Sequence, residues 1–348
     1  MKRRITITRP DDFHCHLRSD EMMHKVIPFS NHFGKVVAMG NLTPPIVTGQ
    51  DAVHYKRQIL DAGATFEPIM SIMLTKETKP SIIYDAWKMG VKVLKLIPSG
   101  TSTGSQQGVA LQALPYYYHV IEKALKCDLI FSGHWELMNE PLGGAEISEY
   151  QREARAIPYL LEVVRLFPNL KIVVEHVSTA AMVDCVINAP QNVAATITAH
   201  HIGPYQWDDV FDKCGNVTKP YLYCKPVLKS RPDVDAVSKA AFSGNPKFFF
   251  GSDSAPHPSD KKLLGKSPAA GIFSAPVAIS WLWECFINNG KTAKDFEKFT
   301  AVFGSNFYGL PVNTDTITLV LKAWQVPSEY DGVVPFLARK ELNWKILD

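Results

Sequence analysis

Two histidines stand one residue apart near the start of the chain, in the stretch FHCHLR at residues 13–18. In a β-strand, alternate side chains point to the same face, so His14, His16 and Arg18 would share one face. Two neutral imidazoles side by side suit a transition-metal ion such as Zn²⁺. The motif alone leaves open a second interpretation, in which both histidines lie on the surface of an edge strand.

Polar residues also end several later apolar runs. Asn41, His134, His176 and Asp253 each close such a run, and Lys95 lies near the end of another. In a parallel barrel the carboxyl ends of the strands converge on one face, which carries the chemistry. A single strand-end histidine can be a structural residue, and a single aspartate can cap the next helix. Their joint occurrence favours one shared site.

The elements that must position these residues recur along the chain as short apolar or β-branched runs separated by segments of helical spacing. This alternation is typical of βα units and a mostly parallel sheet. Eight units predict an α/β fold, a (β/α)8 TIM barrel with a C-terminal extension, as a single domain over residues 1–348. A doubly wound sheet is the competing fold, but no GxGxxG or P-loop motif supports it. The predicted strands cover residues 11–17, 35–41, 66–74, 91–98, 128–134, 171–176, 193–198 and 247–253.

The composition excludes several classes of protein. The 37 basic and 34 acidic residues give a formal charge of +3 and form no basic run, which argues against a nucleic-acid partner. The six cysteines form no CxxC pair, so we expect packing thiols in a reduced, cytoplasmic protein. No apolar stretch approaches the length of a membrane span, and the basic start lacks an apolar signal segment, so no membrane association is expected.

The expected donors are too many for one catalytic ion. Four imidazoles and one carboxylate suit Zn²⁺, and a catalytic zinc keeps about three protein ligands beside an open position. Two ions with a bridging group are therefore expected. A protonated Lys95 beside two dications would be strongly unfavourable. Addition of CO₂ to the neutral amine would give a carbamate anion whose two oxygens could each bind one ion.

Together these motifs resemble the amidohydrolase superfamily and, within it, the bacterial-type dihydroorotases. HxH alone is weakly specific, whereas DDFHCHLR together with GSDSAPH is strongly so. The resemblance implies a cytoplasmic, homodimeric hydrolase that reversibly closes N-carbamoyl-L-aspartate to L-dihydroorotate in pyrimidine biosynthesis. The matching stretches, in the order expected for the family, are DDFHCHLR, MGNLTPP, VLKLIP, VVEH, AATIT, KPYLYCKPVLK, FFGSDSAPHP and NFYGLPV.

The resemblance also implies roles for single residues. Two Zn²⁺ ions per subunit would be bridged by carboxylated Lys95 (N6-carboxylysine) and a hydroxide, and Asp253 would carry the proton from the hydroxide to the leaving nitrogen. One ion would be held by His14, His16, Lys95 and Asp253, the other by Lys95, His134 and His176. The implied substrate-binding residues are Arg18, Asn41, Ser102, Thr103, Leu222, Ala255, His257, Ala270 and Gly271.

Two stretches need separate comment. The small, polar segment PSGTSTGSQQG at residues 98–108 cannot pack a core, and we expect it to close over the site as a lid with Ser102 and Thr103 on the substrate. Trp135 directly follows His134, where the family commonly has a small residue. His200 and His201 are therefore the alternative ligands or substrate contacts.

Three other functions remain open at this point. A hydantoinase or allantoinase could use the same metal pair, although Arg18, Asn41 and His257 favour a substrate with a carboxylate. A Schiff-base aldolase could use unmodified Lys95 as its nucleophile. An inactive barrel could serve as a scaffold for a partner enzyme.

Overall fold

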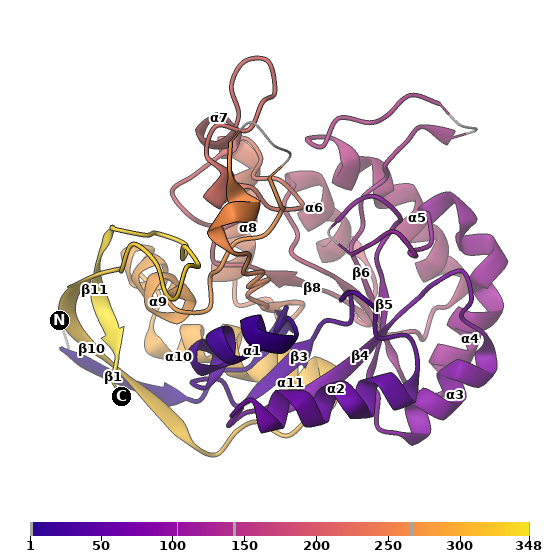
Figure 1. Ribbon diagram of the computed structural model, residues 1–348, viewed down its shortest axis with the longest axis horizontal. Helices are drawn as coiled ribbons and strands as arrows, with labels where there is room; N and C mark the ends of the chain where they lie inside the picture. Colours follow the sequence, from indigo (N-terminus) through magenta and orange to yellow (C-terminus); the bar gives the residue numbers. More distant parts are fainter. Residues whose placement is uncertain (1–2, 103, 142–143, 265–267, 348) are drawn as a thin grey trace.

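The computed structural model describes residues 3–102, 104–141, 144–264 and 268–347. Its centre is an eight-stranded parallel sheet in the order β2-β3-β4-β5-β6-β7-β8-β9, with helices around it (Figure 1). Each strand pairs with the next one in the sequence, whereas a doubly wound sheet would reverse its strand order part-way. The predicted (β/α)8 barrel is therefore confirmed.

The eight barrel strands all fall within the predicted runs. Almost every strand residue is buried, which is why most strand residues are apolar on both faces of the sheet and the few polar ones are buried as well. The strands are β2 (Asp12–Cys15), β3 (Lys35–Ala38), β4 (Glu67–Met73), β5 (Val93–Leu96), β6 (Ile130–Gly133), β7 (Ile172–Val174), β8 (Val193–Ile197) and β9 (Phe248–Phe250).

The barrel closes just beyond the ends of β2 and β9. Cys15 pairs in parallel with Ser254. The backbone N–H of His16 donates to the Ser254 carbonyl at 3.0 Å, and that of Asp253 donates to the His14 carbonyl at 2.8 Å. The FHCHLR and GSDSAPH motifs, which lie at opposite ends of the barrel sequence, are thus hydrogen-bonded neighbours. This pairing places Asp253 beside both histidines of the HxH pair.

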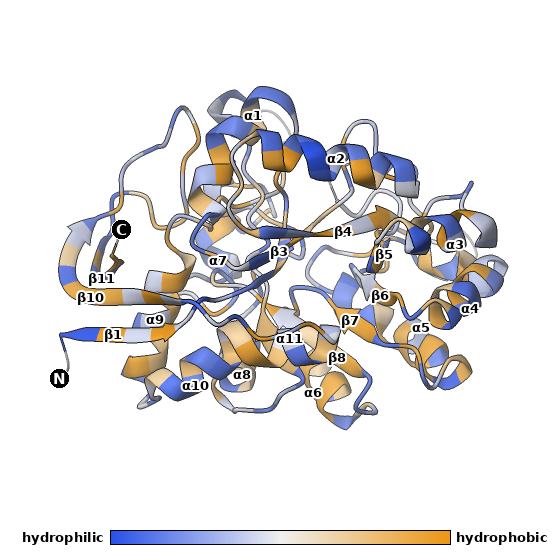
Figure 2. Cartoon of the chain, turned by 90° about the horizontal axis from the view of Figure 1, so that it is seen from below, coloured by the Kyte–Doolittle hydropathy of each residue, from blue (hydrophilic) through white to orange (hydrophobic). Residues whose placement is uncertain are grey.

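Helices cover the outside of the barrel, and Figure 2 shows hydrophobic and hydrophilic stripes along them. They are α1 (Asp20–Val26), α2 (Gly49–Asp61), α3 (Pro80–Lys88), α4 (Tyr118–Lys126), α5 (Arg152–Leu166), α6 (Ala180–Asn188), α7 (Trp207–Val210), α8 (Arg231–Phe242), α9 (Ala278–Asn288), α10 (Ala293–Glu297) and α11 (Phe303–Tyr308). Shorter helical turns are η1 (Ile27–Ser30), η2 (Leu111–Tyr117), η4 (Pro220–Leu222), η5 (Ser259–Lys262) and η6 (Lys298–Val302).

Helix α2 packs on the barrel through a different face from the one its sequence indicates. Ile59 is buried as expected, but Val53 and Leu60 are 41% and 46% exposed. Tyr55, four residues before Ile59, occupies the buried face instead. Its ring is buried while its hydroxyl donates to the Arg18 carbonyl at 2.8 Å, so a polar group is satisfied where an aliphatic residue was expected.

A second, antiparallel sheet of order β1-β10-β11 joins the two ends of the chain, and both termini lie beside it in Figure 1. It consists of β1 (Arg4–Thr8), β10 (Thr316–Gln325) and β11 (Glu341–Ile346). The C-terminal extension is therefore anchored to the N-terminus. Strand β1 was not predicted, although Ile5 and Ile7 alternate with exposed residues as a strand covered on one face requires.

None of the helices in the described parts of the chain is long and apolar enough to cross a membrane. All six cysteines are free thiols. Five are wholly or partly buried, in agreement with a packing role, but Cys214 is exposed and is not a packing residue.

Candidate active site

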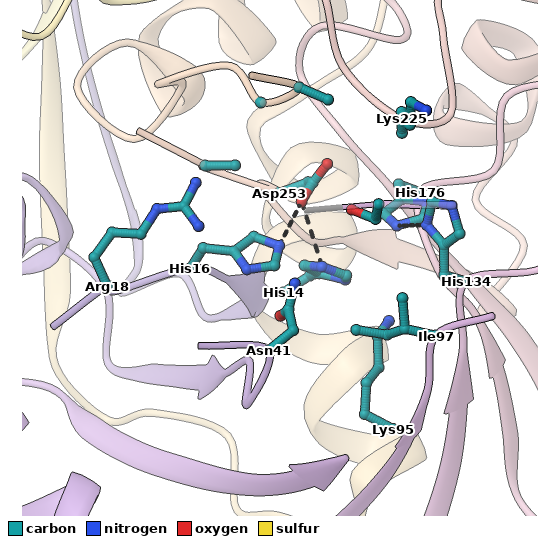
Figure 3. A pocket seen from close by; sticks show the side chains of 14 residues that line it. His14, His16, Arg18, Asn41, Lys95, Ile97, His134, His176, Lys225 and Asp253 are labelled. Carbon is teal, nitrogen blue, oxygen red and sulfur yellow. Dashed lines mark hydrogen bonds and ion pairs between the residues drawn. The ribbon is translucent and has the colours of Figure 1, made fainter. Parts of the chain in front are cut away.

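A small cavity lies at the carboxyl ends of the barrel strands (Figure 3). Twelve of the fifteen predicted site residues line it, together with Ile97 and Lys225. Residues as far apart in the sequence as His14 and Gly271, about 260 positions, thus meet because parallel strands end on one face of the barrel. The twelve are His14, His16, Arg18, Asn41, Lys95, Ser102, His134, His176, Asp253, Ala255, Ala270 and Gly271.

His14, His16 and Asp253 form one group that can hold a metal ion. Asp253 Oδ1 lies 3.1 Å from His16 Nε2 and 3.4 Å from His14 Nε2, as the dashed lines in Figure 3 show. Their ligand atoms all lie within 4.8 Å of one another, and the three side chains are buried. Burial lowers the pKa of both histidines, so both rings are neutral and able to donate a lone pair to a metal.

His134 and His176 form the second group. His134 Nδ1 lies 3.1 Å from His176 Nε2, and His134 Nε2 lies 2.9 Å from the Glu136 carboxylate. Because an ionised carboxylate accepts a hydrogen bond, His134 carries its proton on Nε2, and its Nδ1 lone pair faces His176 Nε2. Trp135 is buried in the main hydrophobic cluster, beside Phe131. A large residue is thus accommodated after His134 without moving it from the cavity.

Lys95 extends from β5 into the space near both groups (Figure 3). Its amine lies 3.4 Å from Ser132 Oγ and 3.9 Å from Glu175 Oε1. Burial lowers its pKa to about 8, against the opposing effect of the Glu175 and Asp253 carboxylates. Lys95 is therefore more often neutral near pH 7 than a surface lysine, and the neutral amine is the form that can add CO₂.

Glu175 connects these groups and was not predicted. Its carboxylate accepts hydrogen bonds from His14 Nδ1 at 2.7 Å, from the Thr196 hydroxyl at 2.6 Å and from the Ser132 hydroxyl. Burial raises its pKa, but the Lys95 charge and the hydrogen bonds from His14 and Ser132 outweigh burial and hold the pKa at about 2. The sequence could have indicated Glu175 only by its position, since it directly precedes His176 at the end of a strand.

Three of the predicted site residues have left-handed backbone conformations. The φ angle is 42° at both His176 and Asp253 and 61° at Arg18. Such a conformation costs a non-glycine residue on the order of 1–3 kcal/mol and persists where its surroundings enforce it. The Thr196 hydroxyl, which accepts from the His176 N–H at 2.7 Å, is one such constraint. The strain lies where strand ends must turn side chains toward the cavity.

Arg18 and His257 form the side of the site suited to a carboxylate. Arg18 Nε donates to the Pro256 carbonyl at 2.8 Å, and Nη2 lies 3.1 Å from His257 Nε2. His257 Nε2 also lies 2.9 Å from the Ala270 carbonyl. His257 does not line the cavity, but it touches two residues that do. Its pKa is lowered to about 2 by burial and by the Arg18 charge, so the neutral ring leaves the guanidinium as the cation here.

Described residues on both sides of position 103, in the 98–108 segment, lie against the site. Ser102 lines the cavity. Gly104 has a φ of 74°, and a Cβ there would lie only 2.7 Å from the Asn41 carbonyl oxygen, so the segment approaches the barrel closely. Thr103 lies outside the described residues.

Leu222 does not line the cavity. It ends η4 and packs at the edge of a separate apolar cluster around Tyr223. The chain reaches the cavity only three residues later, at Lys225. Lys225 was not predicted, because η4 shifts the point at which the KPYLYCKP stretch enters the site.

His200 and His201 do not join the cavity. His201 Nδ1 lies 2.8 Å from Thr198 Oγ1, and Nε2 lies 3.1 Å from the Pro226 carbonyl. With Cys224, whose thiol donates to the same carbonyl at 3.1 Å, they form a second buried group of metal-capable side chains. The protein's own hydrogen bonds already use the His201 nitrogens and the thiol, and His134 takes the position beside His176.

No family model matches the chain. Among curated proteins, the dihydroorotase of Coxiella burnetii is 39% identical to it and covers 99% of this chain and 98% of its own length. The dihydroorotase of Shewanella oneidensis is also 39% identical, covering 98% of this chain and 99% of its own. The chain belongs to the dihydroorotase family.

Two solved dihydroorotase structures agree with this assignment. The enzyme of Saccharomyces cerevisiae, in complex with 5-fluoroorotic acid, has a TM-score of 0.92 at 30% identity and covers 99% of both chains. The dihydroorotase of Campylobacter jejuni has a TM-score of 0.88 at 32% identity, covering 100% of this chain and 98% of its own. An L-hydantoinase of Arthrobacter aurescens has a TM-score of 0.80 at 16% identity and shares the fold alone.

Membership in the dihydroorotase family confirms the resemblance inferred from the motifs. Dihydroorotases are hydrolases that act on cyclic amide bonds, and membership does not favour the hydantoinase, aldolase or scaffold alternatives. The two groups of metal-capable side chains line the same cavity.

Proposed function

We propose that this protein is a zinc-dependent dihydroorotase that reversibly closes N-carbamoyl-L-aspartate to L-dihydroorotate and water. One observation carries the proposal. In a chain of this family, a single cavity is lined by four histidines, a buried lysine and a buried aspartate, and an arginine lines the same cavity. The histidines, aspartate and lysine provide metal donors, and the arginine provides a receptor for a carboxylate.

The donor set fits two zinc ions. His14, His16 and Asp253 would hold one ion, and His134 and His176 the other, with carboxylated Lys95 shared between them. The rings of His14, His16 and His176 are neutral because burial lowers their pKa, as metal ligation requires. When bound, the ions would supply a water activated at neutral pH and would polarise a carbonyl oxygen.

Asp253 would move the proton. Its Oδ1 faces both His14 and His16, which leaves Oδ2 as the oxygen available to the proton. In hydrolysis Asp253 takes a proton from the attacking water and passes it to the ring nitrogen that leaves. In ring closure it would take the proton from the ureido nitrogen as that nitrogen bonds to the carboxyl carbon, and return the proton to the oxygen that leaves this carbon.

The remaining cavity residues would bind and enclose the substrate. Arg18, with Asn41 and His257, would hold the substrate carboxylate through a planar guanidinium fork. Ser102, and by the resemblance Thr103, would close over the substrate and exclude water. The backbone of Ala255, Ala270 and Gly271 would contact the ring and ureido atoms, and Lys225 takes the position proposed from sequence for Leu222.

The family resemblance supports three further proposals. The protein would act as a cytoplasmic homodimer, with the whole chain folding as one domain. Its partner would be a small-molecule substrate, with neither nucleic acid nor a membrane involved.

Replacement of Lys95 tests the proposed chemistry. Purified wild-type protein should contain two zinc ions per subunit and interconvert dihydroorotate and carbamoyl aspartate. Lys95→Ala should lose both metals and activity, because the bridging anion is gone. Lys92→Ala changes an exposed lysine three residues earlier and is the matched control. A Lys95→Ala protein with full zinc and rate would refute the role of Lys95, and an inactive, zinc-loaded wild type would refute the proposed function.

A further inference from the structure

Lys262 is a buried lysine outside the predicted metal and substrate ligands. It ends η5 and is 4% exposed. Its amine donates to the Pro220 carbonyl at 2.9 Å and to the Tyr223 carbonyl at 3.1 Å. Within the described parts of the chain, no carboxylate pairs with it. Burying an amine is unfavourable unless its donors are satisfied, so a lysine here needs a reason that packing does not provide.

The two carbonyls belong to a junction between cavity-forming segments. The Tyr223 carbonyl also accepts from the Gly271 N–H at 2.9 Å, and the Ala269 N–H donates to the Lys261 carbonyl at 2.8 Å. The residues next to this junction, Lys225, Ala270 and Gly271, line the cavity. Lys262 thus ties the η4 segment and residues 269–271 to η5.

The junction leaves little freedom for the backbone. Gly271 has a φ of 147°, and a Cβ there would lie 2.4 Å from the Ala255 carbonyl oxygen. Small displacements of η4 would therefore be transmitted to the segment that carries Ala270 and Gly271. Burial lowers the pKa of Lys262 to about 7, but an amine keeps two N–H donors in either protonation state, so both hydrogen bonds persist across this pH range.

We propose that Lys262 is a positioning residue for substrate binding, whose amine fixes the backbone of Lys225, Ala270 and Gly271 at the place where the substrate ring docks. The inference rests on the proposed function, since it assigns this wall to ring recognition. Lys262 itself does not line the cavity. Its loss should weaken substrate binding and leave the metal ligands in place.

Lys262→Met tests this role because methionine fills similar space without donors. The KM for dihydroorotate should rise at least tenfold, while kcat stays within threefold and two zinc ions per subunit remain. Lys261→Met is the matched control, since that side chain is 67% exposed and its carbonyl bond does not depend on the side chain. The control should behave as wild type.

A Lys262→Met protein whose KM stays within twofold of wild type would overturn the proposal, even if its thermal stability falls, because a merely structural role predicts that pattern. If Lys262→Met does not fold, Lys262→Gln keeps polar donors on a shorter side chain that reaches one carbonyl. Its KM should rise about threefold or more, and an unchanged KM would overturn the proposal. An inactive wild type would instead refute the proposed function on which this inference rests.

Discussion

Glu175→Gln isolates the contribution of a buried carboxylate that touches the metal ligands without being one. The substitution keeps the volume of the side chain and removes its charge. In the wild type the carboxylate accepts from His14 Nδ1 at 2.7 Å, which fixes the proton on Nδ1 and turns Nε2 toward Asp253. An amide that turns its NH₂ group to His14 would favour the other tautomer, and one that turns its oxygen there would leave the Ser132 hydroxyl, which donates to the other carboxylate oxygen, without its present acceptor.

The expected loss of zinc affinity follows from the role of the Glu175–His14 hydrogen bond in orienting His14. Loss of a carboxylate that orients a ligating histidine typically costs 10- to 100-fold in metal affinity, or about 1.4–2.7 kcal/mol. Glu175 accepts three hydrogen bonds from side chains, so the upper part of this range is expected. The fold should persist, because the side chain keeps its size within the barrel.

Zinc affinity, measured by competition with a chromogenic chelator, is the assay. Glu67→Gln is the matched control, since Glu67 is an exposed glutamate at the start of barrel strand β4. We expect Glu175→Gln to release zinc at a chelator strength that leaves the wild type and the control loaded. Equal zinc affinity in all three proteins would show that Glu175 does not orient His14 for a metal.

Four further substitutions, in three experiments, test separate parts of the account. Arg18→Met should raise the KM for dihydroorotate about 30-fold, corresponding to about 2 kcal/mol for a charge-assisted hydrogen-bonded pair, with zinc retained; zinc loss at normal KM would contradict the role of Arg18. Gly104→Ala places a methyl group 2.7 Å from the Asn41 carbonyl oxygen, at a residue with a positive φ. The kcat/KM for dihydroorotate should therefore fall about tenfold. A normal kcat/KM would mean that the 98–108 segment need not approach Asn41 this closely. In urea unfolding, Ile59→Ala should lower the free energy of unfolding by about 2–5 kcal/mol, because Ile59 is buried, and Leu60→Ala should lower it by less than about 0.5 kcal/mol. Equal losses for the two variants would contradict the finding that α2 packs on the barrel through Ile59 and not through Leu60.

The barrel and the gathering of its strand-end residues could be predicted because both follow from local pattern. Buried parallel strands are apolar along their whole length, and their carboxyl ends meet on one face. His134 could therefore be placed beside His176 in spite of the unusual Trp135 between strand and loop. Closure of the barrel then brings Asp253 to the HxH pair through backbone hydrogen bonds.

What could not be predicted depends on the path of single loops and on contacts between distant segments. The turn of η4 moves the cavity contact from Leu222 to Lys225, and no periodic pattern encodes that shift. Strand β1 is short, and its partner β10 lies about 310 residues away, so pairing could not be inferred locally. Glu175 and Lys262 act through other residues, and their sequence surroundings do not distinguish them from ordinary buried charges.

An X-ray structure of the zinc-loaded protein, with anomalous scattering measured at the zinc edge, tests the central claim most directly. The account predicts two peaks, one beside His14, His16 and Asp253 and one beside His134 and His176. Electron density for a carboxylated Lys95 should lie between them. A single peak, or an unmodified Lys95 amine next to the metal site, would contradict the account.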